Sequence, residues 1–436
     1  MKSALAVLVL GLIFAPAAQQ CRAQGEAALP FLLIPPSPQG DGMGGIIGST
    51  ISDDPLAMLA NPGQLGLASL DHYFSVSYFP SATSWLPALH ATDLNYRSSA
   101  LSAGLKLNRF FSLPFELTAG VGYSNVTLNL GTFGISVDDP TVLNYFSAEE
   151  HSNNLSFGIG VDYYLRLGLG YTLKMAQSNL APFDVQRQGR EGVAEATTYD
   201  IGMIGQLPVI GVLDRITGDL ISLSGLAEPL LDISFGYARS NLGDDFVPYI
   251  DPGQADPLPR TARLGLSYKA GVTRRGPAAN WELFSFTLAR EAEDLLVERF
   301  PAPTDSFGNA IASPPPPQYV DGNGAIQFVK NVVLGEGNGR VTLRKGWQLN
   351  FGELFFLRGG SVTGRGVEYT TSGFGVHLGG VLKLLDNLSP AFSSTPFMGF
   401  VVSHIDIRYD HASSDYNDPY NPNNGVTFNA LSVVVK

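Results

Sequence analysis

Apolar and polar residues alternate along much of the chain. In residues 155–173 every odd position is apolar or aromatic, whereas almost every even position is small or polar. A period of two places these two sets on opposite faces of a β-strand. Similar runs recur along the sequence and predict roughly 13 to 15 strands in all. The other expected strands are residues 73–79, 88–96, 100–107, 116–128, 198–204, 230–237, 262–268, 281–288, 341–351, 355–362, 374–384 and 397–409, with a last run from 426.

Alternation of this kind fits two all-β architectures. In an outer-membrane barrel, lipid faces the apolar set and the lumen faces the small and polar set. A β-sandwich produces the same pattern along each strand. Long connections rich in Pro, Gly, Asn and Asp, such as 291–339 and 410–424, alternate here with tight turns, which suits a barrel with one rim outside the cell. We therefore expect a transmembrane antiparallel β-barrel in the outer membrane of a Gram-negative bacterium.

Composition narrows the class further. Charged residues make up 15% of the chain, against roughly 25% in an ordinary globular protein, and there are 49 Gly and 29 Pro. This balance argues against a coiled coil, a long helical array or a polar disordered chain. The formal net charge is −12. Because neutralising phosphates requires a basic surface, we expect no nucleic-acid partner.

The start of the chain is typical of a cleaved export signal. Lys2 precedes an apolar run over residues 4–18, and a polar stretch ends at Ala23 with small residues where a signal peptidase cuts. Cleavage there removes the only cysteine, Cys21. An uncleaved anchor and lipidation of Cys21 are the alternatives. After the signal, no uncharged apolar run approaches the roughly 18 residues expected of a spanning helix.

We therefore expect three parts: an export signal in residues 1–23, an N-terminal plug or periplasmic segment in 24–70, and a barrel in 71–436. The middle part is too glycine-rich and irregular to be barrel wall. Within the barrel, residues 208–226 depart from the strand pattern and predict a short amphipathic helix in a connection.

The N-terminal segment carries four short motifs. They are an apolar start with Phe31, the turn Gly42-Met43-Gly44-Gly45, the acidic pair Asp53-Asp54, and Asn61-Pro62 followed by Leu65. Glycines permit a positive φ and close backbone contact, which a loop folded inside a narrow barrel needs. The acidic pair can cap a helix whose first turn accepts Pro55, and Asn-Pro favours a turn. These features fit a plug or gate and a clasp at the periplasmic end equally well.

In order and spacing, these four motifs resemble the PorV/PorQ family of outer-membrane proteins, a branch of the FadL-like barrels. The chain departs from the family pattern at Gly63-Gln64, at residues 38–40 and at its non-aromatic C-terminal end. A second stretch looks like the family's mid-barrel hairpin and leads into residues 264–268. Its residues are Asn241, Leu242, Gly243, Pro259 and Arg260.

The resemblance implies a barrel of about 14 strands with the N-terminal segment in its lumen. It also implies a role in type IX secretion, in which the barrel binds the C-terminal signal domain of exported proteins and works with other secretion-complex subunits. Aromatic loop tips such as Phe300, Phe307 and Tyr319 would then contact protein. The alternative, from the wider FadL-like group, is passive transport of hydrophobic small molecules. A purely structural barrel is a third possibility, and outer-membrane lipid is a partner in every case.

Other candidate chemistry is weak. Asp162 and Arg166 lie on the polar face of one expected strand and could form an ion pair in the lumen. The acid and amide run in residues 410–424 could hold calcium, although a rim loop of turn-forming residues fits better. The six His show no zinc-ligand spacing, and no nucleophile, paired-carboxylate or phosphate-loop motif is present. We therefore expect no enzyme, no cofactor and no metal site.

Overall fold

The computed structural model describes residues 27–34, 37–89, 93–135, 144–181, 192–218, 223, 227–243, 246–247, 255–275, 279–300, 303, 315–389 and 391–436. The expected export signal, with Cys21, lies outside these residues.

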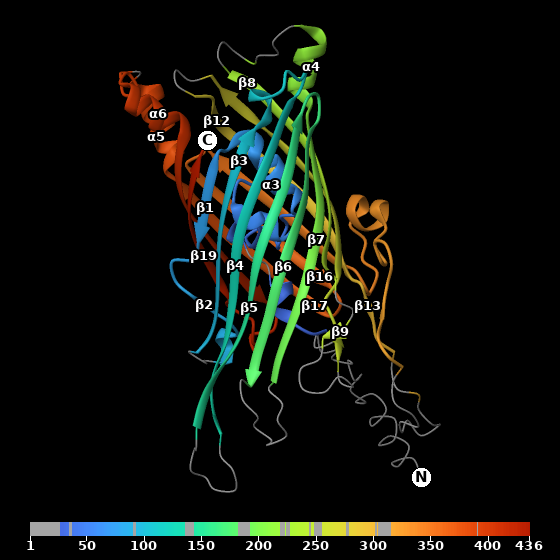
Figure 1. Cartoon of the computed structure of the whole chain (residues 1–436). Coiled ribbons are helices and arrows are strands. Elements are labelled where there is room, and N and C mark those ends of the chain that lie inside the picture. Colours follow the sequence, from blue (N-terminus) through green and yellow to red (C-terminus); the bar gives the residue numbers. More distant parts are fainter. Residues whose placement is uncertain are drawn as a thin grey trace, which may run out of the picture.

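The described chain forms a closed antiparallel β-barrel (Figure 1). β1 pairs with β19 on one side and with β3 on the other, so the wall closes at this strand, and β2 adds only a short edge beside β3. Fourteen strands therefore make the wall, in agreement with the expected number. They are β1 (Phe74–Tyr78), β3 (Leu94–Lys106), β4 (Glu116–Ile135), β5 (Asn144–Asp162), β6 (Arg166–Ala181), β7 (Gly192–Pro208), β8 (Ala227–Gly243), β11 (Thr261–Arg274), β12 (Trp281–Leu295), β15 (Thr342–Phe351), β16 (Phe355–Gly364), β17 (Val367–His377), β18 (Ile405–Tyr416) and β19 (Thr427–Val435).

The longest alternating run is two strands, not one. β5 ends at Asp162 and β6 begins at Arg166, and these two residues pair directly across the hairpin. Because paired residues lie on the same face of a sheet and these two are four positions apart, odd positions stay on one face through the turn. The expectation of a single strand over 155–173 was therefore wrong, although the assignment of faces was right.

The barrel has two different rims. The terminal rim carries both ends of the wall, near Phe74 and Val435, together with short turns and the helices α4 (Val209–Thr217), α5 (Leu378–Leu388) and α6 (Pro396–His404). The loop rim, at the bottom of Figure 1, carries most of the long connections, including 296–341. Its small elements are β2 (Thr83–Ser84), η3 (Pro87–Leu89), β9 (Phe246–Val247), β10 (Asp256–Pro257), β13 (Val297–Glu298), β14 (Gln318–Tyr319) and η6 (Phe328–Leu334); η4 (Leu107–Arg109) lies at the terminal rim.

The helical connections confirm one prediction and correct two. α4 occupies the stretch expected to be a short amphipathic helix. The expected strand 374–384 is wrong beyond His377, where α5 begins, and the expected strand 397–409 is wrong before Ile405, because α6 occupies that part. Short apolar runs suit a helix or a buried strand equally, so the pattern could not separate them. The expected strand 88–96 is wrong at Ala88 and Leu89, which belong to η3, and its end joins the expected strand 100–107 in the single strand β3.

The outer face of the wall is apolar. Leu155, Phe157, Ile159, Leu169 and Tyr171 are all exposed on it, while the residues between them point into the barrel and are mostly buried. An apolar outer belt on a closed barrel is the arrangement that lipid requires, since no strand edge is left unpaired. Among the described residues, no helix has the length and hydropathy needed to cross a bilayer.

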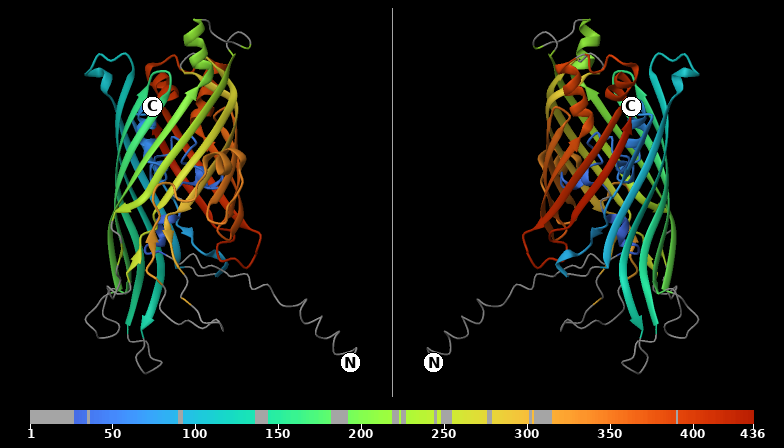
Figure 2. Two further views of the ribbon diagram at one scale, coloured as in Figure 1. Left: turned by 90° about the vertical axis from the view of Figure 1, so that its right-hand side faces the viewer. Right: turned by 90° about the vertical axis from the view of Figure 1, so that its left-hand side faces the viewer.

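The N-terminal segment fills the barrel. Figures 1 and 2 show it as the blue ribbon inside the wall. It begins near the loop rim, where the Ala28 amide donates a hydrogen bond to the Pro257 carbonyl (2.8 Å), and ends at the terminal rim, where the Tyr73 amide donates to the Val435 carbonyl (2.9 Å). We call residues 27–73 the plug. Its elements are η1 (Pro30–Leu33), α2 (Pro38–Asp41), η2 (Pro55–Leu59) and α3 (Gly63–Asp71).

Candidate functional site: the plugged lumen

One side of the plug packs directly on wall glycines. α3 lies against β5 and β6. A Cβ at Gly160 would overlap the Gly66 carbonyl, and a Cβ at Gly170 would overlap the Pro62 carbonyl. Backbone of the plug therefore contacts backbone of the wall, and only glycine leaves room for it. The other wall glycines whose Cβ would meet plug atoms on this side are Gly104, Gly120, Gly122, Gly158, Gly168 and Gly202.

The glycine turn rests on the opposite wall. Gly44 and Gly45 have φ of 76° and 74°, the left-handed region expected for this motif. The Gly44 amide donates to Thr371 Oγ1 (2.8 Å), and Arg344 donates to the Gly44 carbonyl (3.0 Å). Met43 is buried with Ile46 of the plug and Ala289 of β12. The motif therefore lies inside the lumen and contacts β12 to β17.

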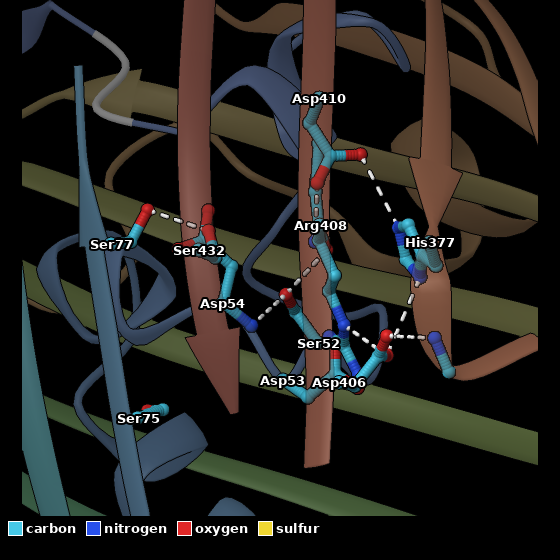
Figure 3. Close-up of polar contacts among 12 residues, drawn as sticks. Ser52, Asp53, Asp54, Ser75, Ser77, His377, Asp406, Arg408, Asp410 and Ser432 are labelled. Atoms are coloured by element: carbon cyan, nitrogen blue, oxygen red, sulfur yellow. Dashed lines mark hydrogen bonds and ion pairs between the residues drawn. The ribbon is translucent and has the colours of Figure 1, made fainter. Parts of the chain in front are cut away.

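Charged side chains bind the plug on this second side (Figure 3). Asp53 of the plug forms an ion pair with Arg408 of β18, whose Nε also donates to Asp406 (2.6 Å). His377 lies between Asp406 (3.8 Å) and Asp410 (3.7 Å). Asp410 in turn pairs with Arg358 at 2.6 Å, and both of these side chains are 1% exposed. Charges buried in this way persist because each has a partner of opposite sign.

A second charged group holds the middle of the plug. The Gly48 amide donates to Glu291 of β12 (3.0 Å), and Ser267 donates to the Ser49 carbonyl (3.0 Å). Arg263 of β11 lies 3.5 Å from Glu291 and 2.6 Å from Glu293. Glu293 also forms an ion pair with Arg344 (3.3 Å). The inner face of β11 to β18 is thus charged where the inner face of β4 to β7 is mainly glycine and small polar residues.

Local contacts within the plug explain two of its motifs. Asp54 caps η2, as expected, by accepting from the Leu56 amide (3.0 Å), and it also accepts from Ser37 (2.6 Å). Asn61 Oδ1 accepts from the Gly63 amide (3.0 Å), which makes the expected turn. The Asn61 amide group then donates to the carbonyls of Gly48 (2.7 Å) and Met203 (3.0 Å), so it joins two parts of the plug to β7.

A polar cavity of about 500 Å³ lies between the plug and the terminal rim. It is lined by charged and amide side chains from the plug, the wall and α5. At its edge, burial lowers the pKa of Lys383 on α5, while the neighbouring Glu353 (2.6 Å) opposes that change. Its lining includes Gln39, Asp53, His72, Arg166, Asp232, Lys269, Glu282, Arg358, Asp406 and Arg408.

The other half of the lumen, toward the loop rim, is apolar and filled. Leu29, just before η1, and Phe31 within it are 0% and 2% exposed, and they belong to one buried cluster with Leu56, Met58 and Leu65. Wall residues complete it, among them Tyr96, which contacts Phe79 and Phe428 edge to face. The expected apolar start of the plug therefore occupies the outer half of the lumen and does not clasp the terminal rim.

The residues of the second predicted motif lie together at the loop rim. Asn241, in a left-handed conformation with φ of 58°, donates to the Pro259 carbonyl (2.9 Å) and accepts from Lys174 (3.0 Å). Arg260 donates to the Gly243 carbonyl (2.7 Å), and Leu242 is buried beside them. These bonds join the end of β8 to the start of β11, so the motif shapes the rim.

The predicted ion pair between Asp162 and Arg166 is present, but across a hairpin. Arg166 Nε lies 3.5 Å from Asp162, and its terminal nitrogen lies 2.6 Å from Asp71 at the end of α3. Arg215 of α4 approaches Asp162 from the rim at 4.0 Å. The pair therefore also ties the last turn of the plug to the wall.

Two further expectations concern the loops. The expected loop 410–424 is wrong over residues 410–416, which belong to β18; in the turn after that strand, Asn424, Asp418 and Asn421 accept from nearby amides at 2.9, 2.9 and 3.0 Å. Among the described residues, no group of three or more His, Cys, Asp or Glu side chains could hold a metal ion.

Tyr319 is not a free loop tip, because Arg260 stacks on its ring at 3.5 Å. Phe300 is half-buried, and Phe307 lies outside the described residues.

The charged residues that hold the plug were missed by sequence reasoning. Arg358, His377, Asp406, Arg408 and Asp410 come from three strands and look like isolated charges in the sequence. One feature of the sequence could have indicated them. Each is at an inward position between outward apolar residues, where a charged side chain is energetically unfavourable without a partner. The alternating glycines at 158, 160, 168 and 170 were a second signal, because small residues on the inner face leave space for a plug.

Taken together, the closed wall, the apolar outer belt and the filled lumen define a plugged outer-membrane β-barrel. No protein-family model matches the sequence, and no curated protein matches it either.

Solved structures of similar fold are outer-membrane barrels. TodX, the toluene transporter of Pseudomonas putida, is 10% identical, with 91% of this chain and 96% of TodX covered at a TM-score of 0.36. A FadL homologue of Pseudomonas aeruginosa is 9% identical, with 91% and 97% covered at 0.35. CdiB from Acinetobacter baumannii is 9% identical, with 83% of this chain covered at 0.30, and the chain spans only 59% of CdiB. None of the three is a PorV or PorQ structure.

Proposed function

We propose that the protein is a passive channel for small hydrophobic molecules across the outer membrane, closed at rest by its plug. The observation that carries this proposal is the division of the lumen. The outer half is an apolar volume occupied by η1, and the inner half is an open polar cavity that leads to the terminal rim. An apolar solute that displaces Leu29 and Phe31 finds the same surroundings those side chains leave.

The attachment of the plug supports the same function. On β4 to β7 it is held mainly by close packing on glycines, whereas on β11 to β18 ion pairs and hydrogen bonds add to close contacts at Gly346 and Gly360. Release of the charged contacts would let the plug shift while α3 stays in place. Hinged displacement of this kind is a common route to opening. TodX, one of the barrels of similar fold, is a transporter of toluene, which is a small hydrophobic molecule.

The secretion role implied by the PorV/PorQ resemblance has no observation of its own in this structure. Tyr319, one of the expected protein-contacting tips, is engaged with Arg260 and Leu258. We therefore propose the channel and not the secretion role.

Uptake by whole cells tests the channel. Cells lacking the protein are complemented with the wild type, with Phe31→Ala or with Phe157→Ala, and uptake of radiolabelled toluene and oleate is measured beside hydrophilic maltose. Phe31 fills the apolar lumen, whereas Phe157 faces outward and is 49% exposed. We expect the wild type to raise uptake of one hydrophobic probe, Phe31→Ala to raise it several-fold more, and Phe157→Ala to match the wild type. Equal uptake with and without the protein, for wild type and Phe31→Ala alike, would overturn the proposal.

A further inference from the structure

The connection between β12 and β15 folds back along the outside of the barrel. Figures 1 and 2 show its orange segment lying on the outer wall. Ile326, Val332 and Val341 pack on outward residues of β11, β12 and β15, and Ala262 and Ala292 beneath them are fully buried. Asp294 accepts from the Ala325 amide (2.7 Å), and Arg290 donates to the Val333 carbonyl (2.6 Å). The described part of this connection is therefore a fixed element on the lipid-facing side.

A groove of about 570 Å³ lies beside η6 on this outer face. Its sides are apolar and aromatic, and its floor is wall backbone at small residues. Neighbouring residues of η6, such as Val329 and Leu334, are 63% and 59% exposed, as suits a helix in contact with lipid. The lining residues used here are Leu266, Tyr268, Leu288, Val333 and Trp347, with Ala289 and Gly346 in the floor.

Two cations face each other at one end of this groove. Arg290 of β12 and Lys345 of β15 are direct cross-strand partners on the outward face, and both line the groove. Like charges opposite each other destabilise a sheet, and a lipid-facing Arg or Lys is unfavourable to a degree that depends on its depth in the bilayer. Within the described part of the chain, neither cation has a carboxylate within ion-pair distance. Arg290 is held by the Val333 carbonyl, but the two cations together leave an uncompensated positive charge that attracts an anion.

The groove has a direction. Leu288 and Trp347 lie two residues from Arg290 and Lys345 on the side toward the terminal rim, so the apolar part points to the middle of the wall and the cations to the loop rim. In outer-membrane barrels, the rim with the long loops faces outside the cell. An amphiphile of the outer leaflet has this orientation, with its anionic head near the rim and its chains toward the bilayer centre.

We propose that this groove binds a phosphorylated lipid of the outer leaflet. Its phosphate lies between the Arg290 guanidinium and the Lys345 ammonium, and an acyl chain lies along Leu266, Tyr268, Leu288 and Trp347. Phosphate suits this pair because Arg and Lys form strong charge-assisted hydrogen bonds to it. The bound lipid would also cover η6 and hold the connection against the wall. This site lies outside the lumen, so it does not depend on the proposed channel.

Native mass spectrometry of the detergent-purified protein tests the site with three probes. They are bisphosphorylated lipid A, the same lipid without phosphates, and oleate. Lys345→Gln is the key variant, because the Lys345 ammonium group makes no hydrogen bond among the described contacts. Its loss leaves the hydrogen bond from Arg290 to the Val333 carbonyl of η6 intact. Arg97→Gln is the matched control, since Arg97 is an exposed, outward cation on β3 opposite an uncharged residue, Thr127.

We expect the wild type to bind lipid A about tenfold more tightly than either Lys345→Gln or the wild type with the dephosphorylated lipid. The double variant Arg290→Gln with Lys345→Gln loses the preference, and Arg97→Gln keeps it. Three outcomes would each overturn the proposal: equal binding by wild type and Lys345→Gln, equal binding of the two lipid A forms, or a preference for oleate over lipid A.

Discussion

The two sides of the plug are attached to the wall by different physics. On β4 to β7, glycines let the plug backbone approach the wall so closely that almost no free space remains. On β11 to β18, plug backbone also meets wall backbone at Gly346 and Gly360, but buried ions and hydrogen bonds add to the contact, and a cavity of about 500 Å³ adjoins them. Packing of the first kind cannot be exchanged for water, whereas ions can be rehydrated. The comparison teaches that the side with the ion pairs and the cavity has more freedom to open than the side held by glycine packing alone.

The largest effect should come from filling the glycine side. Gly160→Val places side-chain atoms on the Gly66 carbonyl and on Thr118 Oγ1. Because neither backbone can move away, we expect a loss of more than about 3 kcal/mol in the free energy of unfolding, or a barrel whose plug is displaced. Urea unfolding in vesicles and single-channel conductance measure the two results. Gly339→Val is the control, since nothing lies within 4 Å of a Cβ there; equal behaviour of the two variants would show that the contact is not tight.

Breaking the buried ion pair between Arg358 and Asp410 should have the next largest effect on stability. Both side chains are 1% exposed, and Arg358→Met leaves the Asp410 carboxylate with only Gln39 and His377 beside it, so the variant should cost about 3–5 kcal/mol. Adding Asp410→Asn removes that charge and should restore part of the loss. Thermal unfolding of the wild type, the single variant and the double variant measures the difference. A double variant less stable than the single one would mean that the charge is not what matters at this site.

A smaller effect is expected where the plug contributes only one member of the cluster. Asp53→Asn removes the plug's ion pair, but Arg408 keeps Asp406 as a partner. We expect a loss of about 1–3 kcal/mol, seen mainly as more frequent channel opening rather than as unfolding. Conductance recordings at low and high salt measure it. If opening is as rare in Asp53→Asn as in the wild type at both salt concentrations, the charged side does not control the gate.

The smallest effect should be at the end of α3. Asp71 is 48% exposed, and its pair with Arg166 competes with water. We expect Asp71→Asn to cost less than about 1 kcal/mol and to leave conductance unchanged. The same urea and conductance measurements apply. A loss as large as that of Asp53→Asn would reverse the assignment of fixed and opening sides.

The wall could be predicted from the sequence because lipid imposes a period of two on every outward position. The period-two pattern gave a wrong prediction where apolar residues continue from a strand into a rim helix, as at Leu378 and Phe397. In the plug, Gly44, Gly45 and Asp54 were predicted from backbone chemistry, which is local. The partners of Asp53 were not, because Arg408 lies 355 positions away in the chain and pairing across a closed barrel depends on shear and register, which no local pattern encodes.

The closing strand has a consequence for biogenesis. β1 is joined to β19 by only five residue pairs, with Ser432 donating to Ser77 (2.9 Å) on the inner face. The plug comes before β1 in the chain and rests on glycine surfaces too tight for anything to slide past after closure. We therefore expect the wall to close around a plug that is already in position, with the N-terminal segment acting as an internal template for the barrel.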